Sequence, residues 1–217
     1  MTLLSTRDES KRQAQLTRDD WIEAALEVLV GEGVGAVQIT SLAKKLNVTR
    51  GSFYWHFTGR EELLGSLLKE WHARNTGVML SALAHAGSLE EGILDLFAVW
   101  VDHKRFDPAL DQAVRDWARR SQGVRDVVAE EDESRVSAIA AFFERNGFAA
   151  TEAFIRARVL YFTQVSYYAL GVEEPMTERV SYLEAYFRCF TGREIDPAAA
   201  DAFIARRTAE GGADISK

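Results

Sequence analysis

The stretch 40–60, TSLAKKLNVTRGSFYWHFTGR, constrains the fold of this chain more than any other. Its first part has the apolar spacing of a short amphipathic helix, carried by Leu42, Ala43 and Leu46. A four-residue break at 47–50 follows. Beyond the break, Phe53 and Phe57 are four residues apart, so both lie on one face of a second short helix. Two short helices joined by a tight turn predict a helix-turn-helix.

Positive charge is concentrated in this stretch. It contains no Asp or Glu, and its basic residues are Lys44, Lys45, Arg50 and Arg60. The whole chain has a net charge of -7. Residues 1–60 carry 8 basic and 7 acidic residues, whereas the remainder carries 18 basic and 26 acidic residues. An acidic body disfavours indiscriminate attraction to nucleic acid or membrane, so any contact with DNA should be local.

The second helix presents side chains suited to DNA. If Phe53 and Phe57 face the core, helical geometry turns the residues between them outward. We expect Arg50 and Ser52 to read base edges, while neighbouring hydroxyls, aromatic rings, an imidazole and a guanidinium contact the backbone. The alternative is an ordinary helical bundle with a solvated basic face. The predicted DNA-contacting residues are Thr40, Lys44, Thr49, Arg50, Gly51, Ser52, Tyr54, Trp55, His56 and Arg60.

The run LNVTRGSFYWHF at 46–57, followed by Arg60-Glu61-Glu62-Leu63, resembles the DNA-binding signature of the TetR family of bacterial transcriptional regulators. The resemblance covers residues 17–70. It implies an all-α fold with an N-terminal three-helix head and a C-terminal body that binds a small-molecule effector and dimerises. It also implies a repressor as the commoner mode of action.

Helix signals place the elements around this stretch. Thr17 with Asp20 predicts a capping box, as does Thr58 with Glu61, and Thr40 is expected to be an N-cap. No strand pattern is present, and all three prolines fall at predicted helix starts. We therefore expect an all-α chain. Its predicted parts are a flexible arm at 1–16, the DNA-binding domain at 17–60, an effector-binding and dimerisation domain at 61–210, and a flexible tail at 211–217.

The segment 159–170, VLYFTQVSYYAL, is apolar or aromatic on nearly every face. It is too short to span a bilayer, so it needs a second covering surface of protein or ligand. We expect the last two major helices to pair with their mates in a homodimer, although a core bundle within one subunit is the alternative. Two heads about 34–36 Å apart would read a palindromic operator. The predicted interface residues are Leu160, Tyr167, Val180, Leu183, Phe187 and Phe190.

Aromatic residues of the body could line a pocket with a few polar tips, as small-molecule sites commonly do. The alternative is that these rings simply fill the core. A ligand that prefers one conformer would shift the population away from the DNA-binding state. The effector is not identified by the sequence. The candidate ligand-binding residues are Phe97, Trp100, His103, Trp117, Tyr161, Gln164 and Tyr168.

Other classes of function find little support. The single cysteine, Cys189, suits a reducing cytoplasm and is expected to be a buried small hydrophobe. The N-terminal residues lack the apolar run of a signal peptide. No catalytic motif or metal-ligand spacing is present, and the acidic run 130–133 is interpreted as a solvated helix face. We predict no catalytic residue, metal or cofactor. The remaining alternative is a helical small-molecule-binding protein without sequence-specific DNA binding.

Overall fold

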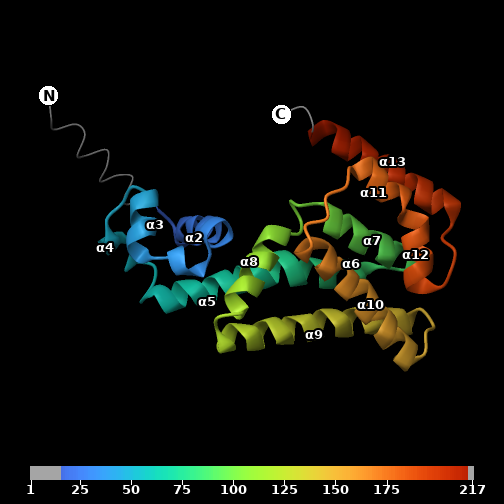
Figure 1. Cartoon of the computed structure of the whole chain (residues 1–217), viewed down its shortest axis with the longest axis horizontal. Helices are drawn as coiled ribbons and strands as arrows, with labels where there is room; N and C mark the ends of the chain where they lie inside the picture. The colour runs from blue at the N-terminus through green and yellow to red at the C-terminus, as the bar shows by residue number, and fades with distance from the viewer. Residues whose placement is uncertain (1–15, 215–217) are drawn as a thin grey trace. The chain divides into compact units, whose positions relative to one another are not determined.

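The computed structural model describes residues 16–214, and side chains through residue 207. Residues 1–15 of the predicted arm and the last three residues of the predicted tail lie outside the described residues. Within this range the chain is all-α and contains no strand, as predicted (Figure 1). The elements are α2 (Arg18–Glu32), the 3₁₀ helix η1 (Val34–Ala36), α3 (Ile39–Lys45), α4 (Arg50–Phe53), α5 (Arg60–Trp71), the π-helix η2 (His72–Gly77), α6 (Val78–His85), α7 (Leu89–Val101), α8 (Pro108–Ala118), α9 (Gln122–Arg145), α10 (Ala150–Ala169), α11 (Met176–Ser181), α12 (Leu183–Thr191) and α13 (Pro197–Asp214).

The chain divides into two compact units. The head unit comprises residues up to 73 together with 109–128, and the body unit comprises 74–108 and the residues from 129 onward. The head unit is therefore larger than the predicted domain at 17–60. Apolar side chains of α5 and α8, including Leu67, Trp71 and Leu110, belong to the same buried cluster as the helices of the head. Separate stretches of sequence therefore complete one core.

The head is built on α2, which begins as the sequence predicts. The Thr17 hydroxyl accepts the Asp20 N–H at 3.3 Å, and the Asp20 carboxylate accepts the Thr17 N–H at 2.7 Å. This capping box satisfies donors that the first turn would otherwise leave unpaired. Trp21 is fully buried and meets the edge of the Phe53 ring, with the ring centroids 5.2 Å apart. The contact holds α4 against α2.

Two predicted caps are displaced in the structure. Gln38, not Thr40, is the N-cap of α3, so Thr40 lies in the first turn with its side chain exposed. Before α5, the Thr58 N–H and hydroxyl both donate to the carboxylate of Glu62, at 2.8 and 2.9 Å. Glu61 was the expected partner. Because Gly59 is the N-cap of α5, the residue that reaches back to Thr58 is one position later than the spacing suggested.

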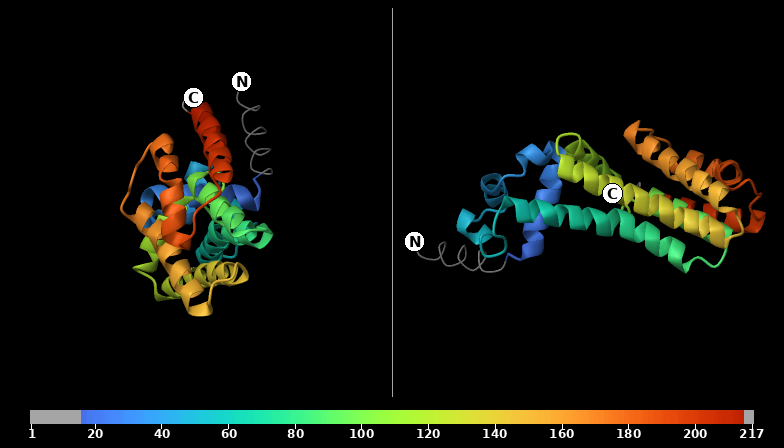
Figure 2. Two further views of the ribbon diagram at one scale, coloured as in Figure 1. Left: turned by 90° about the vertical axis from the view of Figure 1, so that its right-hand side faces the viewer. Right: turned by 90° about the horizontal axis from the view of Figure 1, so that it is seen from below.

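The body unit packs helices closely around a second core. Helices α6 and α7 contact each other, as do α11 and α13, which lie side by side in Figure 1. Figure 2 shows the chain from two further sides. At Gly92 an added Cβ would lie 2.2 Å from the Phe142 ring, so the close approach of α7 and α9 requires glycine. The predicted final major helix is divided into α11 and α12. The following α13 extends to Asp214, beyond the predicted end of the body at 210.

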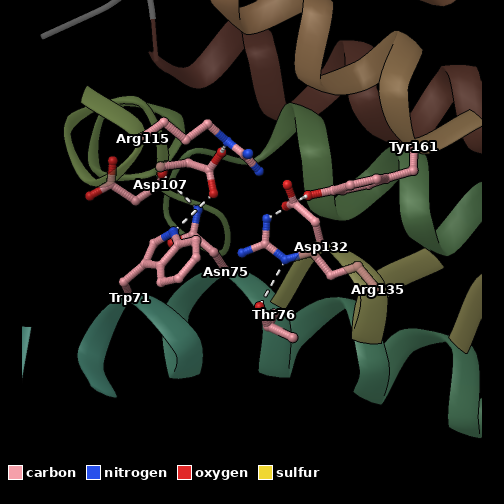
Figure 3. Close-up of polar contacts among 9 residues, drawn as sticks. Trp71, Asn75, Thr76, Asp107, Arg115, Asp132, Arg135 and Tyr161 are labelled. Atoms are coloured by element: carbon pink, nitrogen blue, oxygen red, sulfur yellow. Dashed lines mark hydrogen bonds and ion pairs between the residues drawn. The ribbon is translucent and has the colours of Figure 1, made fainter. Parts of the chain in front are cut away.

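A buried polar network crosses the body unit (Figure 3). Arg135 is only 1% exposed, and its guanidinium donates to the Thr76 hydroxyl at 2.8 Å and to the Tyr161 hydroxyl at 2.9 Å. Tyr161 in turn donates to Asp132 at 2.6 Å. Because a buried charge is costly without partners, this network fixes the π-helix η2, α9 and α10 in register. Asp132, predicted to be solvated, is part of it.

Candidate functional site

The helix-turn-helix is formed by α3 and α4. The turn passes through Asn47, which has a positive φ of 55°, a conformation that Asn tolerates better than most residues. The Val48 N–H then donates to the Ala43 carbonyl at 2.9 Å and closes the end of α3. Phe53 and Phe57 are buried at 0% and 3% exposure, which confirms their predicted place in the core.

Most predicted DNA-contacting residues share one exposed surface, which we call the α3–α4 face. It comprises Thr40, Lys44, Thr49, Arg50, Gly51, Tyr54 and Trp55, all of them exposed. Trp55 is 87% exposed and Tyr54 is 54% exposed, which is unusual for such large rings unless a partner covers them. His56, also predicted, is only partly exposed at the edge of this surface.

Two cations of the α3–α4 face have no acidic partner among the described residues. Neither Lys44 nor Arg50 forms an ion pair there, whereas Lys45 is paired with Glu27 at 3.0 Å. A cation held without an internal counter-ion can neutralise a phosphate at little cost in lost contacts. The face therefore combines positive charge, hydroxyls and exposed aromatic rings.

Ser52 does not lie on this surface. Its side chain is buried at 9% exposure, on the side of α4 that faces the head core. The helix ends after Phe53, so there is no second turn to carry the predicted outward face. The expectation that the Ser52 side chain points outward is therefore wrong, and its predicted contact with base edges gains no support from the structure.

The Arg60 side chain forms hydrogen bonds within the head. Its Nε donates to the Val37 carbonyl at 2.7 Å, and its Nη2 donates to the Val34 carbonyl at 2.8 Å. These carbonyls belong to the segment between α2 and α3, where the Val34 carbonyl also accepts the Val37 N–H at 3.3 Å. Arg60 thus ties that segment to the start of α5, and its predicted contact with the DNA backbone is replaced by a structural role.

Two carboxylates stabilise the N-terminal ends of α2 and α5. Hydrogen bonds from Thr58, the backbone N–H foremost, lower the pKa of Glu62. Those from Thr17 lower the pKa of Asp20 in the same way. Arg18 also reaches Glu62 at 3.7 Å and lies over the Phe57 ring, 4.6 Å from its centroid. Both carboxylates therefore stay ionised at neutral pH and continue to accept the hydrogen bonds from Thr17 and Thr58.

The body unit contains a largely apolar cavity with an empty volume of about 620 Å³, counted to its open mouth. Three of the predicted ligand-binding residues, Phe97, Trp100 and Gln164, line it together. The full lining comprises Phe97, Trp100, Val101, Leu160, Thr163, Gln164, Tyr167, Arg179, Val180, Leu183, Tyr186, Phe190 and Phe203.

The other predicted ligand-binding residues lie outside this cavity. His103 is exposed, and Trp117 belongs to the core of the head unit. Tyr161 faces the buried network around Arg135. Tyr168 stacks on Phe106 with a centroid distance of 5.6 Å and donates its hydroxyl to the Trp100 carbonyl at 2.6 Å. Helical spacing alone could not show which side of each helix met the cavity.

The predicted dimer residues are mostly covered by the chain itself. Leu160, Val180, Leu183, Phe187 and Phe190 are each no more than 7% exposed, and Tyr167 is partly buried. All except Phe187 line the cavity. These side chains therefore belong to the interior of one subunit, as the alternative of a core bundle suggested.

A different set of apolar side chains on α10 is exposed. Ile155, Val159 and Phe162 are 52%, 50% and 40% exposed, and Leu170 is 78% exposed. Their helical spacing places them along one side of α10. We call these four residues the α10 stripe. Soluble proteins rarely expose such a contiguous apolar surface without a partner.

One cation borders the otherwise apolar cavity. Arg179 lies over the ring of Tyr167, 4.5 Å from its centroid, and forms no ion pair among the described residues. The Tyr167 hydroxyl donates to Glu174, and burial together with that bond raises the pKa of Tyr167 to about 12. Tyr167 is therefore neutral at physiological pH. The buried amide Nε2 of Gln164 has no hydrogen-bond partner in the described part of the chain.

Metal-binding clusters and membrane-spanning helices are absent from the described residues. Across 16–214 there is no group of three His, Cys, Asp or Glu side chains placed to hold a metal. None of the helices described is both long and apolar enough to cross a bilayer. Cys189, expected to be buried, is exposed because it lies on the outer side of α12.

Comparison with known proteins agrees with the head geometry. Residues 22–67 match the sequence profile of "Bacterial regulatory proteins, tetR family". The chain is 46% identical over 56 residues to the HTH-type transcriptional regulator SrpR of Pseudomonas putida, a match covering 26% of each chain. It is 36% identical over 69 residues to the tetracycline repressor protein class D of Escherichia coli, covering 32% of each. The matches thus span about a quarter to a third of these relatives.

The likeness in fold extends further along the chain. A transcriptional regulator from Rhodococcus superposes with a TM-score of 0.57, covering 90% of this chain and 97% of that one, at 18% sequence identity. At that identity the likeness concerns the fold alone.

Proposed function

We propose that this chain, which belongs to the TetR family of bacterial transcriptional regulators, represses transcription as a homodimer on a palindromic operator and is released by a small molecule. The observation that carries the proposal is the α3–α4 face, with Arg50 and Lys44 unpaired beside exposed Tyr54 and Trp55. Similarity to the tetracycline repressor favours repression. A bacterial regulator that binds DNA in this way would work in the cytoplasm, associated with the nucleoid.

The residues of the α3–α4 face divide the work on DNA. Arg50 is the first residue of α4, and its guanidinium can donate two hydrogen bonds to a guanine edge in the major groove. Lys44, at the end of α3, is suited to a phosphate. The Tyr54 hydroxyl and Trp55 ring can contact the sugar–phosphate backbone, while Thr40, Thr49, Gly51 and His56 border the contact. Base reading therefore depends on Arg50.

Replacing Arg50 tests this assignment. Arg50→Ala should lower affinity for the operator by about 1–3 kcal/mol for each half-site and relax the preference at one base pair of each half-site. Lys44→Ala is the matched control, since loss of a phosphate contact should weaken binding to all sequences alike. Both are measured by fluorescence anisotropy on the operator and on single-base variants. Unchanged sequence preference in Arg50→Ala would refute the assignment.

The homodimer is proposed to form through the α10 stripe rather than through the residues first expected. A second copy of the chain would cover Val159, Phe162 and Leu170, which otherwise stay in water. In a two-fold interface the same patch is used on both subunits, so a self-complementary apolar stripe suits it. Such a dimer presents two heads to two half-sites.

Sedimentation tests the interface. Val159→Asp should convert a dimer to a monomer at micromolar concentration, because each dimer would bury two carboxylates without partners. Ala84→Asp, at an exposed position of α6, introduces the same charge on another helix of the body unit and should leave the dimer intact. A wild-type monomer at these concentrations, or a dimer that survives Val159→Asp, would contradict the proposal.

Release by the effector requires that ligand and DNA prefer different conformers. If the ligand binds the DNA-free conformer more tightly, its differential affinity weakens operator binding by the same factor. A coupling of about 2–3 kcal/mol changes occupancy by one to two orders of magnitude. The cavity is lined mainly by apolar and aromatic side chains with a few polar groups, which is the lining that small-molecule sites commonly have.

A further inference from the structure

The chemistry of the body cavity indicates which class of molecule it accepts. Its walls are mainly apolar and aromatic, and the rings of Tyr186 and Phe190 stack almost parallel, with an angle of 9° between them. Such walls favour an apolar, ring-sized body. Among the side chains that line the cavity, Arg179 alone carries a formal charge.

The positive charge of Arg179 is not neutralised within the described residues. The carboxylate of Glu174 accepts a hydrogen bond from the Tyr167 hydroxyl, and no acidic side chain of the described residues is within ion-pair distance of Arg179. The ring of Tyr167 supports the guanidinium from one side without supplying an anion. A cation left in this state at the border of an apolar cavity can pair with an anion that enters from solvent.

Gln164 supplies a second polar contact on the same cavity. Its amide Nε2 is buried and donates to no group of the described chain. A buried donor without a partner is costly, and a ligand oxygen would remove that cost. A guanidinium and an amide donor together fit the two oxygens of a carboxylate, since guanidinium groups bind carboxylates in a fixed fork geometry.

We propose that the cavity binds a monocarboxylic acid with an apolar, ring-sized body, whose carboxylate pairs with Arg179 and accepts a hydrogen bond from Gln164. This assignment rests on the proposed role of the cavity as the effector site. It names the chemical class of the effector and predicts that a neutral molecule of the same shape binds less tightly.

Matched acids and amides test the proposal directly. Benzoate, 2-naphthoate and 4-phenylbutyrate are each compared with their primary amides by isothermal titration calorimetry on the full chain without DNA. At least one acid should bind at least tenfold more tightly than its amide. In Arg179→Gln that preference should fall to about twofold or less, while binding of the amide is unchanged. In Arg179→Lys, which keeps the charge, part of the preference should remain.

Arg188→Gln is the control variant, since Arg188 is exposed on α12 and lies outside the cavity. It should keep the full preference, and circular dichroism should show all variants folded. The proposal is overturned if no acid binds better than its amide, or if the preference survives in Arg179→Gln. Because no DNA is present, that failure leaves the DNA-binding function standing. Loss of DNA binding, in turn, would leave the acid preference measurable.

Discussion

Replacing Arg60 distinguishes a structural role of this residue from a role in contacting DNA. Arg60→Ala removes charged donors at 2.7 and 2.8 Å from the carbonyls of Val37 and Val34. A hydrogen bond from a charged donor contributes about 1.5–3 kcal/mol, and we discount this to about 1 kcal/mol each because solvent reaches the side chain. The side chain is 28% exposed. We therefore expect a loss of about 2 kcal/mol, which lowers the melting temperature by roughly 4–8 °C.

The assay is thermal unfolding followed by circular dichroism, together with DNA binding over a range of salt. Arg60→Ala should melt earlier, yet keep the wild-type dependence of log affinity on log salt at temperatures where it is folded. Lys44→Ala should do the reverse, reducing the slope by about 1.8, because a dimer loses one phosphate contact per subunit, with little change in melting. An unchanged melting temperature with a reduced salt slope in Arg60→Ala would refute the structural assignment.

Further predictions concern the buried network and two ionisable groups. Tyr161→Phe removes a donor to Asp132 and should lower the free energy of unfolding in urea by about 2–3 kcal/mol; a change under 0.5 kcal/mol would contradict this. The pKa of Glu62 is lowered on folding, so its bonds from Thr58 stabilise the head above its unfolded pKa near 4.5 and are lost as pH falls through the lowered value. The melting difference between wild type and Glu62→Gln should thus shrink from pH 7 to pH 3, and a constant difference would argue against it. The pKa of Tyr167 is raised to about 12, so the stability it contributes is complete below pH 10 and falls between pH 10 and 12. Absorbance titration at 295 nm, with Tyr167→Phe as reference, should show the late ionisation, and a midpoint at pH 10 would exclude it.

Short-range patterns predicted the helix-turn-helix well. Phe53 and Phe57 are buried, as predicted. Their orientation depends only on their four-residue spacing, which is a local property of the sequence. Ser52 was placed wrongly because that reasoning assumed a longer helix, whereas α4 ends at Phe53. Arg60 could not be placed from spacing, since its acceptors lie 23 and 26 residues earlier in the chain.

The body shows where periodicity stops being informative. The all-round apolar segment of α10 predicted two covering surfaces, and the structure shows only the one that the chain itself supplies. The segment did not predict which side chain meets which surface. Leu160 faces the cavity while its neighbour Val159 is exposed. That assignment depends on where α12 packs against α10, a long-range contact that the sequence of α10 does not contain. Gln164 and Phe97 were found because polar tips among aromatic residues are a local signal.

The most direct measurement is the affinity of the full chain for palindromes in its own upstream DNA, compared with scrambled DNA of the same composition. Fluorescence anisotropy is recorded over a range of salt, because phosphate contacts dominate both affinities. The account predicts that one palindrome binds at least about 10³-fold more tightly than scrambled DNA near physiological salt. Equal affinity for all palindromes and their scrambled counterparts would contradict it and would favour a small-molecule-binding protein without sequence-specific DNA binding.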